Sequence, residues 1–363
     1  MSSPHVSGSR PIASLVVATT CAVLAIANGA HAQSLGPDFK DHYTITDLGS
    51  VPGVTPSYGG LLFAPGDTSV LLIGGAAHLT SAAIDAILVL RGPDSHVTGF
   101  ASKGAVFFQA APGVSGGIDG GLDVGPDCTS FYTTYPDNHI GQLESSSVNP
   151  DRLVDLSPLG VAGSTGALRF VPPGFPGAGR LKIVSRDSSR WYDATVSPDG
   201  NGTFDIAVSP TFVQLAGGLE GIVYVGAVNP GFGGDSVLVV NSDLGQVTAY
   251  LIDANGDPMP DSQSVFITGL AGAQGAAVDP VTGDVLFSTF GGGNRVIRVS
   301  GFTPPSSCPA DLTADGIVDG ADLGLLLAQW GPTTGSTADL NGDQMVDGAD
   351  LGAMLGAWGA CAR

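Results

Sequence analysis

The sequence contains few basic residues and few charged residues of any kind. Of its 363 residues, 13 are Lys or Arg and 33 are Asp or Glu, and charged residues make up 13% of the chain. With no basic stripe to neutralise phosphates, the sequence predicts no nucleic-acid partner and no electrostatic attraction to anionic lipid. The formal net charge of −20 favours cations as partners and supports solubility.

Long hydrophobic runs are also scarce, since the only one lies near the N-terminus. The apolar run 12–27 follows Arg10 and precedes Ala30-His31-Ala32, a small-x-small sequence. The run is roughly 16 residues long, which is short for a membrane span of about 20. We therefore predict a signal peptide over 1–32, cleaved after Ala32, rather than an N-terminal anchor. The mature chain is expected to be exported, extracellular or at the cell surface, without a membrane span.

Cysteine is rare, with four residues in the whole chain. Removal of the leader takes away Cys21, and an exported protein can form disulfides. We predict a disulfide between Cys308 and Cys361, which flank the C-terminal segment. Closing a loop of roughly 50 residues stabilises a fold by about 4 kcal/mol in the chain-entropy model. Cys128 is predicted to be a half-buried turn residue without a catalytic role.

Glycine and proline, by contrast, are abundant, with 55 and 25 residues, and 43% of the chain is apolar. This composition fits a secreted, turn-rich and mainly β protein. A short strand pattern recurs after a glycine, with copies at 59–63, 121–125, 166–170, 221–225 and 275–279. Each copy is followed by a turn and by further β-branched or aromatic strands, so the repeat predicts four-stranded units.

Such units, repeated every 45–62 residues, predict a β-propeller over 41–302 with about five blades. A six-bladed ring with one degenerate blade and a β-sandwich are the alternatives. The fifth unit lacks a fourth strand, and the N-terminal segment 43–48 has the matching pattern. We expect this segment to complete the last blade, which closes the ring and removes exposed sheet edges.

Two segments of this region resemble the sugar-lactonase and NHL-repeat propellers. They are Gly-Leu-Asp-Val-Gly-Pro-Asp at 121–127 and Val-Asp-Pro-Val-Thr-Gly-Asp-Val-Leu-Phe at 278–287. The resemblance extends over most of 41–302 and implies the propeller fold, not an activity.

In a propeller, the residues just before each first strand crowd one mouth of the central channel. Here they are Tyr58, Asp119 or Gly120, Thr165, Glu220 and Gln274. Two carboxylates with neutral oxygens can hold a divalent cation. Leu219-Glu220-Gly221 is similar to the Glu-Gly step that supplies a metal ligand in sugar lactonases, but the other ligands of that family have no counterpart here. The alternative is that these carboxylates are hydrated loop residues.

Recognisable catalytic motifs are missing from this region. The chain has no Gly-x-Ser-x-Gly, Walker A or dinucleotide fingerprint, and no histidines at ligand spacing. We therefore assign no catalytic residue and expect His42, His78, His96 and His139 to be surface or turn residues.

After a Pro/Ser linker at 303–307, one pattern occurs twice, 28 residues apart, within 308–361. Oxygen-bearing side chains fall at positions 1, 3, 5, 9 and 12 of each 12-residue loop, and position 7 offers a backbone carbonyl. This is the spacing at which an EF-hand-type loop surrounds Ca²⁺. The predicted ligands of two calcium ions are Asp311, Thr313, Asp315, Ile317, Asp319 and Asp322, and Asp339, Asn341, Asp343, Met345, Asp347 and Asp350.

A helix is predicted after each loop. Apolar residues at i, i+3, i+4 and i+7 form a stripe on each helix, from Leu323 to Trp330 and from Leu351 to Trp358. We expect the two stripes to pack face to face as the core of a small calcium-stabilised module.

A doubled calcium loop in which each copy is followed by one helix resembles a type I dockerin. The resemblance covers 308–361 and implies calcium binding and docking onto a cohesin domain, usually within polysaccharide-degrading machinery. Gln344 stands where the family has glycine, which costs about 1 kcal/mol. Gly320-Ala321 and Gly348-Ala349 replace the family's partner-recognition pairs, which weakens the expectation of a cohesin.

Two classes of function follow from these observations. The first is a secreted propeller that binds a ligand, such as a carbohydrate, and is docked by its calcium module to a cohesin-like or cell-surface protein. The second is a propeller hydrolase or lactonase acting on a sugar-derived substrate and tethered by the same module. A tail that serves only as a structural or sorting element is a third alternative.

Overall fold

The computed structural model describes Met1 and residues 33–102, 107–304, 308–313, 317–333, 336–341 and 343–360. The predicted cleavage site at Ala32, part of the linker, Asp315 and Cys361 lie outside these residues, so the expectations placed on them remain predictions. Within the described residues, no helix has the length and apolarity that crossing a membrane requires.

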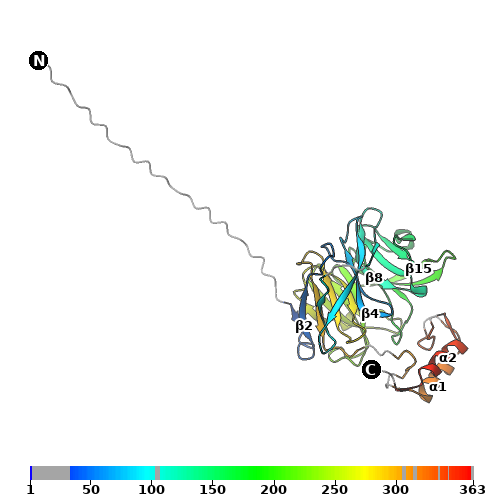
Figure 1. Cartoon of the computed structure of the whole chain (residues 1–363). Helices are drawn as coiled ribbons and strands as arrows, with labels where there is room; N and C mark the ends of the chain where they lie inside the picture. The colour runs from blue at the N-terminus through cyan, green and yellow to red at the C-terminus, as the bar shows by residue number, and fades with distance from the viewer. Residues whose placement is uncertain are drawn as a thin grey trace. The chain divides into compact units, whose positions relative to one another are not determined.

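Five antiparallel sheets form a ring of blades (Figure 1). Blade one is β3 (Leu61–Ala64), β4 (Asp67–Gly75), β5 (Ala83–Arg91) and β6 (Val97–Phe100), with β7 (Phe107–Ala110) also on β5. Blade two is β8 (Gly117–Val124), β9 (Ser130–Tyr135), β10 (His139–Leu143) and β11 (Arg152–Asp155). Blade three is β12 (Thr165–Phe170), β13 (Leu181–Ser185), β14 (Arg190–Pro198) and β15 (Phe204–Gln214). Blade four is β16 (Leu219–Val225), β17 (Ser236–Asn241), β18 (Gln246–Leu251) and β19 (Ser264–Thr268), extended by β1 (Ser34–Leu35). Short 3₁₀ turns lie at Pro126–Cys128, Ser157–Leu159 and Pro260–Ser262.

The fifth blade is completed by the N-terminal strand. It comprises β20 (Ala273–Val278), β21 (Val285–Thr289), β22 (Val296–Ser300) and β2 (Thr44–Gly49). Strand β2 pairs antiparallel with β22, from Thr44 opposite Ser300 to Gly49 opposite Val296. The predicted fold, with five blades and an N-terminal closing strand, is confirmed, and the six-bladed and sandwich alternatives are wrong.

The repeated glycines allow the innermost strands to approach one another around the channel. A Cβ at Gly221 would lie 2.6 Å from the carbonyl oxygen of Gln274, and one at Gly275 would lie 2.5 Å from that of Gly59. No other residue fits these positions without a backbone shift. The glycine repeat that indicated the blades is therefore a consequence of close packing at the ring's centre.

Ion pairs between blades one and five strengthen the ring where it closes. Arg91 binds the buried Asp279 with two hydrogen bonds, of 2.6 and 2.9 Å. His96 Nδ1 lies 2.6 Å from Oδ2 of the buried Asp284. His96 lies in the turn between β5 and β6, as expected of a turn histidine, and in addition it satisfies a buried carboxylate from the neighbouring blade.

The second part of the fold is a small two-helix module. Helices α1 (Gly320–Ala328) and α2 (Gly348–Gly356) each begin with a capping box, in which an Asp N-cap and an Asp three residues later satisfy each other's backbone N–H groups. Two short ladders connect the copies, β23 (Ile317–Val318) with β26 (Gly359–Ala360) and β24 (Gly331–Pro332) with β25 (Met345–Val346).

The apolar stripes of these helices are only partly buried, which corrects the sequence prediction. Leu326 and Met354 are fully buried in the module's core, and Leu323 and Leu351 pack against it. The last two members of each stripe face away from this core. Their exposed fractions are 52% for Leu327, 49% for Trp330, 53% for Leu355 and 49% for Trp358. A module this small has one narrow core, so only one turn of each stripe reaches it.

Candidate functional site

The five innermost strands bring Asp119 and Glu220 together at one mouth of the channel. Asp119 lies in β8 and Glu220 in β16, and both side chains are fully buried. Gln274, in β20, lies between them. With its nitrogen directed at the carboxylates, Nε2 donates to Asp119 Oδ1 at 3.1 Å and to Glu220 Oε2 at 3.0 Å. The hypothesis of hydrated loop carboxylates is therefore wrong for this pair.

Three loops cover the carboxylate pair. Each joins the second and third strands of its blade, and one aromatic ring comes from each loop or, for Tyr135, from the last residue of the strand before it. His78 stacks on Phe290 with ring centroids 4.3 Å apart and lies 4.5 Å from the ring of Tyr135. His78 Nε2 also lies 2.8 Å from Asp119 Oδ1. His78 lies in the turn between β4 and β5, as expected of a turn histidine, but its side chain closes the site over Asp119.

A fourth loop of the same kind, in blade three, supplies the site's cation. Arg186 lies 3.3 Å from Glu220 Oε1, and its guanidinium also donates to Asp243. Its carbon Cζ stands 5.9 Å from the centre of the Tyr135 ring. Because an arginine stays charged, it holds a fixed positive charge beside Glu220.

Burial raises the pKa of both carboxyl groups. For Glu220, burial and the nearby Asp119 carboxylate raise the pKa well above its usual value, although Arg186 opposes the shift. For Asp119, burial raises the pKa, against the opposing effects of His78 and Arg186. Asp119 Oδ2 is buried and has no hydrogen-bond partner among the described residues. The buried pair is therefore more stable when at least one of the two carboxyl groups is protonated, or when a cation is bound between them, than when both are charged and unpaired.

The other residues predicted at this mouth take different roles. Gly120 lets Glu220 approach, because a Cβ there would lie 2.7 Å from Glu220 Oε2. The hydroxyl of Tyr58 binds the backbone of Val51, and the hydroxyl of Thr165 donates to Asn138.

Sequence reasoning missed the covering residues His78, Tyr135, Arg186 and Phe290. Each of them lies at the end of the second strand of its blade or in the turn that follows it. Aligning the repeat at that turn would have shown that the four positions correspond, but their residue types differ, so the alignment would not have marked them as a site.

The second of the two predicted calcium loops has its oxygen-bearing side chains arranged within one tight turn. Asp339 accepts the backbone N–H groups of Asp343 at 3.1 Å and Gln344 at 2.8 Å. Asn341 Oδ1 accepts the N–H of Asp343 at 3.0 Å, and Asp343 Oδ1 accepts that of Met345 at 2.9 Å. Gln344 has a φ of +68°, the left-handed conformation that glycine adopts most easily.

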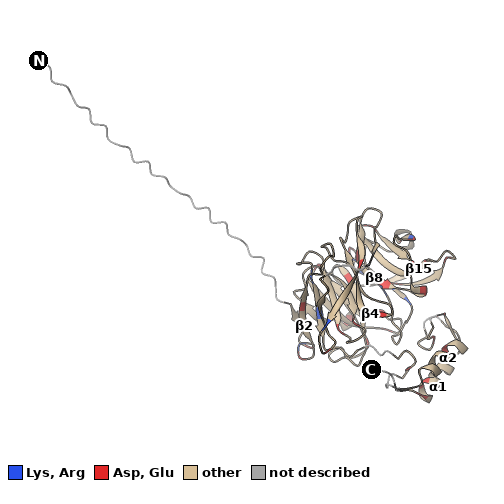
Figure 2. Cartoon of the chain, in the orientation of Figure 1, with Lys and Arg blue, Asp and Glu red and all other residues tan. Residues whose placement is uncertain are grey.

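The last carboxylate of each loop fastens the loop to its helix. Asp350 accepts N–H groups from Leu340, Asn341 and Asp347, and Asp322 accepts those of Thr313 and Asp319. Both carboxylates are buried in the first turn of their helices, where acidic positions stand out in Figure 2. A hard cation such as Ca²⁺ takes oxygen ligands of this kind.

The calcium ligands themselves remain predictions. Among the described residues, no cluster of three or more His, Cys, Asp or Glu side chains is arranged to hold a metal ion. In the first loop, Asp315 and the side chain of Ile317 lie outside the description. Cys308 is buried in the module's core, but Cys361 is not described, so the disulfide also stays a prediction. Cys128 does lie in a turn, but it is exposed rather than half-buried.

The fold defines this chain as a five-bladed β-propeller protein with a small helical module. No known family matches the sequence, and no curated protein matches it. Similar solved structures include a glutaminyl cyclase from Myxococcus xanthus, 13% identical over 71% of this chain and 96% of the other, with a TM-score of 0.43. Another is a putative gluconolactonase, 13% identical over 74% of this chain and 97% of the other, with a TM-score of 0.42. A third is an auxiliary nutrient binding protein from Bacteroides thetaiotaomicron, 9% identical over 71% and 76%, with a TM-score of 0.42. These similarities assign no activity to this chain.

Proposed function

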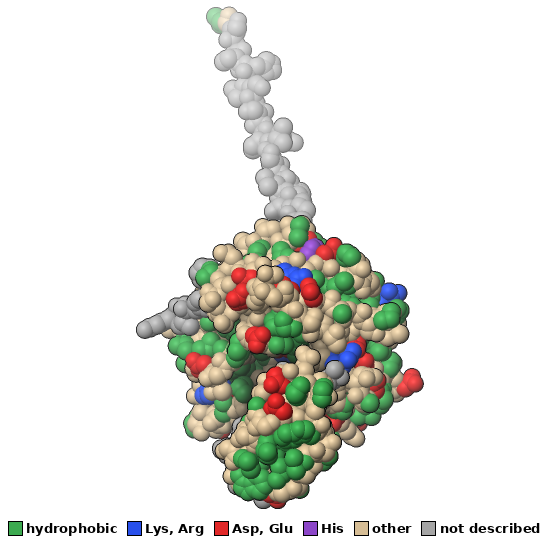
Figure 3. All heavy atoms as spheres, turned by 90° about the vertical axis from the view of Figure 1, so that its right-hand side faces the viewer, with side chains coloured by type: hydrophobic (Ala, Val, Ile, Leu, Met, Phe, Trp, Pro, Cys, Tyr) green, Lys and Arg blue, Asp and Glu red, His purple; other side chains and the backbone are tan. Residues whose placement is uncertain are grey.

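We propose that this protein is a calcium-dependent docking protein, whose C-terminal module attaches the propeller to a scaffold or cell-surface protein outside the cell. The observation that carries the proposal is the matched exposure of Leu327, Trp330, Leu355 and Trp358. The same two large apolar side chains are left exposed at the same place in both copies of the module. The module's hydrophobic side chains form a continuous area in the space-filling view (Figure 3).

Calcium binding in the loops would hold this exposed apolar area together. Each loop leads directly into the helix that carries one half of the exposed area, through Asp322 or Asp350. Two ions would offset about half of the negative charge of the loop carboxylates and fix the helix starts, as metal binding and folding are coupled in small metal-stabilised modules. Without the ions, repulsion among the loop carboxylates would loosen the helices, and the two halves of the area would no longer be held together.

The test uses the full chain as bait for secreted and envelope proteins of its host, in calcium and then in chelator. The wild type should capture a partner that the chelator releases. The pair Trp330→Ala and Trp358→Ala should lose that partner while binding calcium normally. Leu153→Ala, a matched change at an exposed apolar residue of the propeller, should retain it. Equal capture by the tryptophan pair variant, or capture without calcium, would contradict the proposal.

A second candidate, a propeller hydrolase or lactonase acting on a sugar-derived substrate, is favoured by the convergence of Asp119 and Glu220 on Gln274. With the Gln274 oxygen turned toward the carboxylates instead of its nitrogen, three oxygens would face one another, and a shared cation would stabilise that arrangement. Otherwise a protonated Glu220 is available as an acid. Both carboxyl groups are fully buried, so a substrate would reach them only after His78 or Arg186 moves.

A panel of lactones and sugar esters tests this candidate. Turnover should be abolished by Glu220→Gln and retained by Glu144→Gln, a matched change at the chain's other glutamate. Turnover that survives Glu220→Gln would remove the candidate.

A further inference from the structure

The inner strands also form a cavity, which is distinct from the cluster around Asp119 and Glu220. Its lining comes from the C-terminal ends of β3, β12, β16 and β20 and the turns that follow them, whereas Asp119, Glu220 and Gln274 lie toward the starts of their strands. The cavity holds about 330 Å³, at the small end of the range for ligand pockets. Apart from Arg169, its walls are apolar or hydroxyl-bearing, and Leu62, Phe63, Val223 and Val278 make up much of them.

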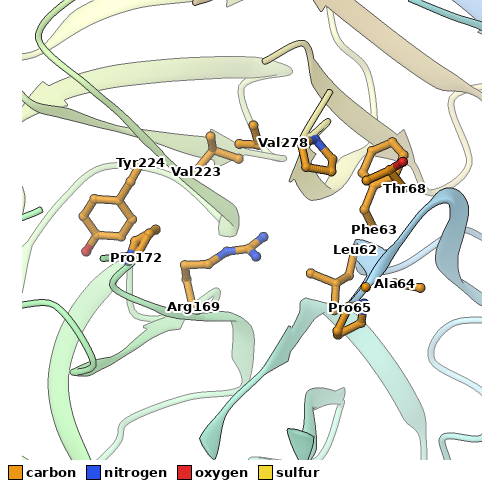
Figure 4. Close-up of a pocket in the computed structure, with 12 residues that line it drawn as sticks. Leu62, Phe63, Ala64, Pro65, Thr68, Arg169, Pro172, Val223, Tyr224 and Val278 are labelled. Atoms are coloured by element: carbon orange, nitrogen blue, oxygen red, sulfur yellow. The ribbon is translucent and has the colours of Figure 1, made fainter. Parts of the chain in front are cut away.

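Arg169 is the one charged residue in this lining. Figure 4 shows its guanidinium directed into the space between Val223 and Val278 on one side and Leu62 and Pro65 on the other. The arginine is held rigidly by three blades. Nε donates to the carbonyl of Ile222 at 3.1 Å, Nη2 to that of Ala276 at 2.6 Å, and Nη1 to Asp123 Oδ1 at 3.2 Å.

These bonds leave donors available. A guanidinium has five N–H groups, two of them on each terminal nitrogen. The partners among the described residues use one on each nitrogen, so one N–H remains on Nη1 and one on Nη2. The carboxylate of Asp123 is shared with the backbone N–H groups of Val124 and Phe170, and its bond to Arg169 is the longest of the arginine's three. A fixed arginine with two free N–H groups in an apolar cavity is suited to a carboxylate, which accepts two N–H bonds side by side.

We propose that this cavity binds a small organic acid, with its carboxylate on Arg169 and a compact apolar body, such as a phenyl ring or a short alkyl chain, against Leu62, Val223 and Val278. The volume of about 330 Å³ is sufficient for a ligand of this size. The apolar walls select against hydrated inorganic anions, since such an anion would lose its water without gaining apolar contact. The site shares no residue with the module's docking area or the carboxylate pair, so this proposal can be confirmed or refuted independently of the proposed function.

The experiment is isothermal titration calorimetry on the full chain, with 3-phenylpropanoate and its neutral amide as probes. We expect saturable binding of the acid, and binding of the amide that is about tenfold weaker or more, because the charge-assisted bonds are lost. Arg169→Gln should reduce the affinity for the acid to that for the amide.

Because Arg169 also connects blades, Arg169→Gln could disturb the fold. Val278→Phe provides a second test, since it fills the cavity and leaves the guanidinium in place. It should abolish binding while the melting temperature stays near that of the wild type. No saturable binding by the folded wild type, equal affinity for acid and amide, or full binding by Val278→Phe would each overturn the proposal.

Discussion

The left-handed conformation of Gln344 predicts that glycine at this position will strengthen the second calcium loop. Its φ of +68° costs a non-glycine residue about 1–2 kcal/mol. Glycine removes this cost but loses about 0.5–1 kcal/mol more conformational entropy on folding. The central values of these two ranges give Gln344→Gly a net gain of about 0.75 kcal/mol, or about three- to fourfold tighter calcium binding.

The assay is competition for calcium between the full chain and a calibrated chelator. The control is Gln344→Ala, which keeps the Cβ and hence the strain. The hydrogen bonds of Gln344 are made by its backbone, to Asp339 and Thr333, so neither variant removes them. We expect Gln344→Ala to match the wild type and Gln344→Gly to bind more tightly. Equal affinities for the two variants, or weaker binding by Gln344→Gly, would refute the reasoning.

Three further predictions concern the propeller. Lys182 is fully buried and forms ion pairs with Asp193 and Asp257. Lys182→Met leaves these carboxylates without their cation, so it should lower the free energy of unfolding by about 3–5 kcal/mol in a denaturant titration. Adding Asp257→Leu should restore part of this loss. Glu220 has a raised pKa in the folded state, so its stabilising effect is present at low pH and is lost as pH rises through that pKa. Above about pH 4.5, thermal melts should therefore show that the stability of Glu220→Gln increases relative to that of the wild type, by up to about 1.4 kcal/mol per pH unit. Ile45→Pro in the closing strand β2 should lower the free energy of unfolding by at least about 1–3 kcal/mol. Ser34→Pro in the two-residue outer strand β1 should lower it much less. Equal losses for the two variants would argue against ring closure by β2.

The propeller was predictable because its strongest sequence signal has a packing cause. The glycines that mark each first strand are required where inner strands meet, so they recur in every blade. The closing strand 43–48 was predictable for a related reason, since a ring with one missing strand needs it from elsewhere in the chain.

The covering residues of the site were not predictable in the same way. His78, Arg186 and Phe290 share a turn in the repeat but not a residue type, so no pattern of composition marks them. Arg169 was missed because a single arginine in a strand gives no sign that the strand ends at a cavity. The prediction that the two helical stripes pack fully against each other was wrong for a different reason. Periodicity indicates which residues share a helix face, but not how much of that face a neighbour covers, and half of each stripe here remains exposed.

The central claim is that the module binds two calcium ions, and its most direct test is the number of ions bound per chain. Calcium uptake would be measured by titration calorimetry on the full chain and on the variant Asp322→Ala with Asp350→Ala. The account predicts that this variant binds two fewer ions than the wild type, with the propeller's thermal transition unchanged. The same number of ions bound by both proteins, or no uptake by the wild type, would contradict it.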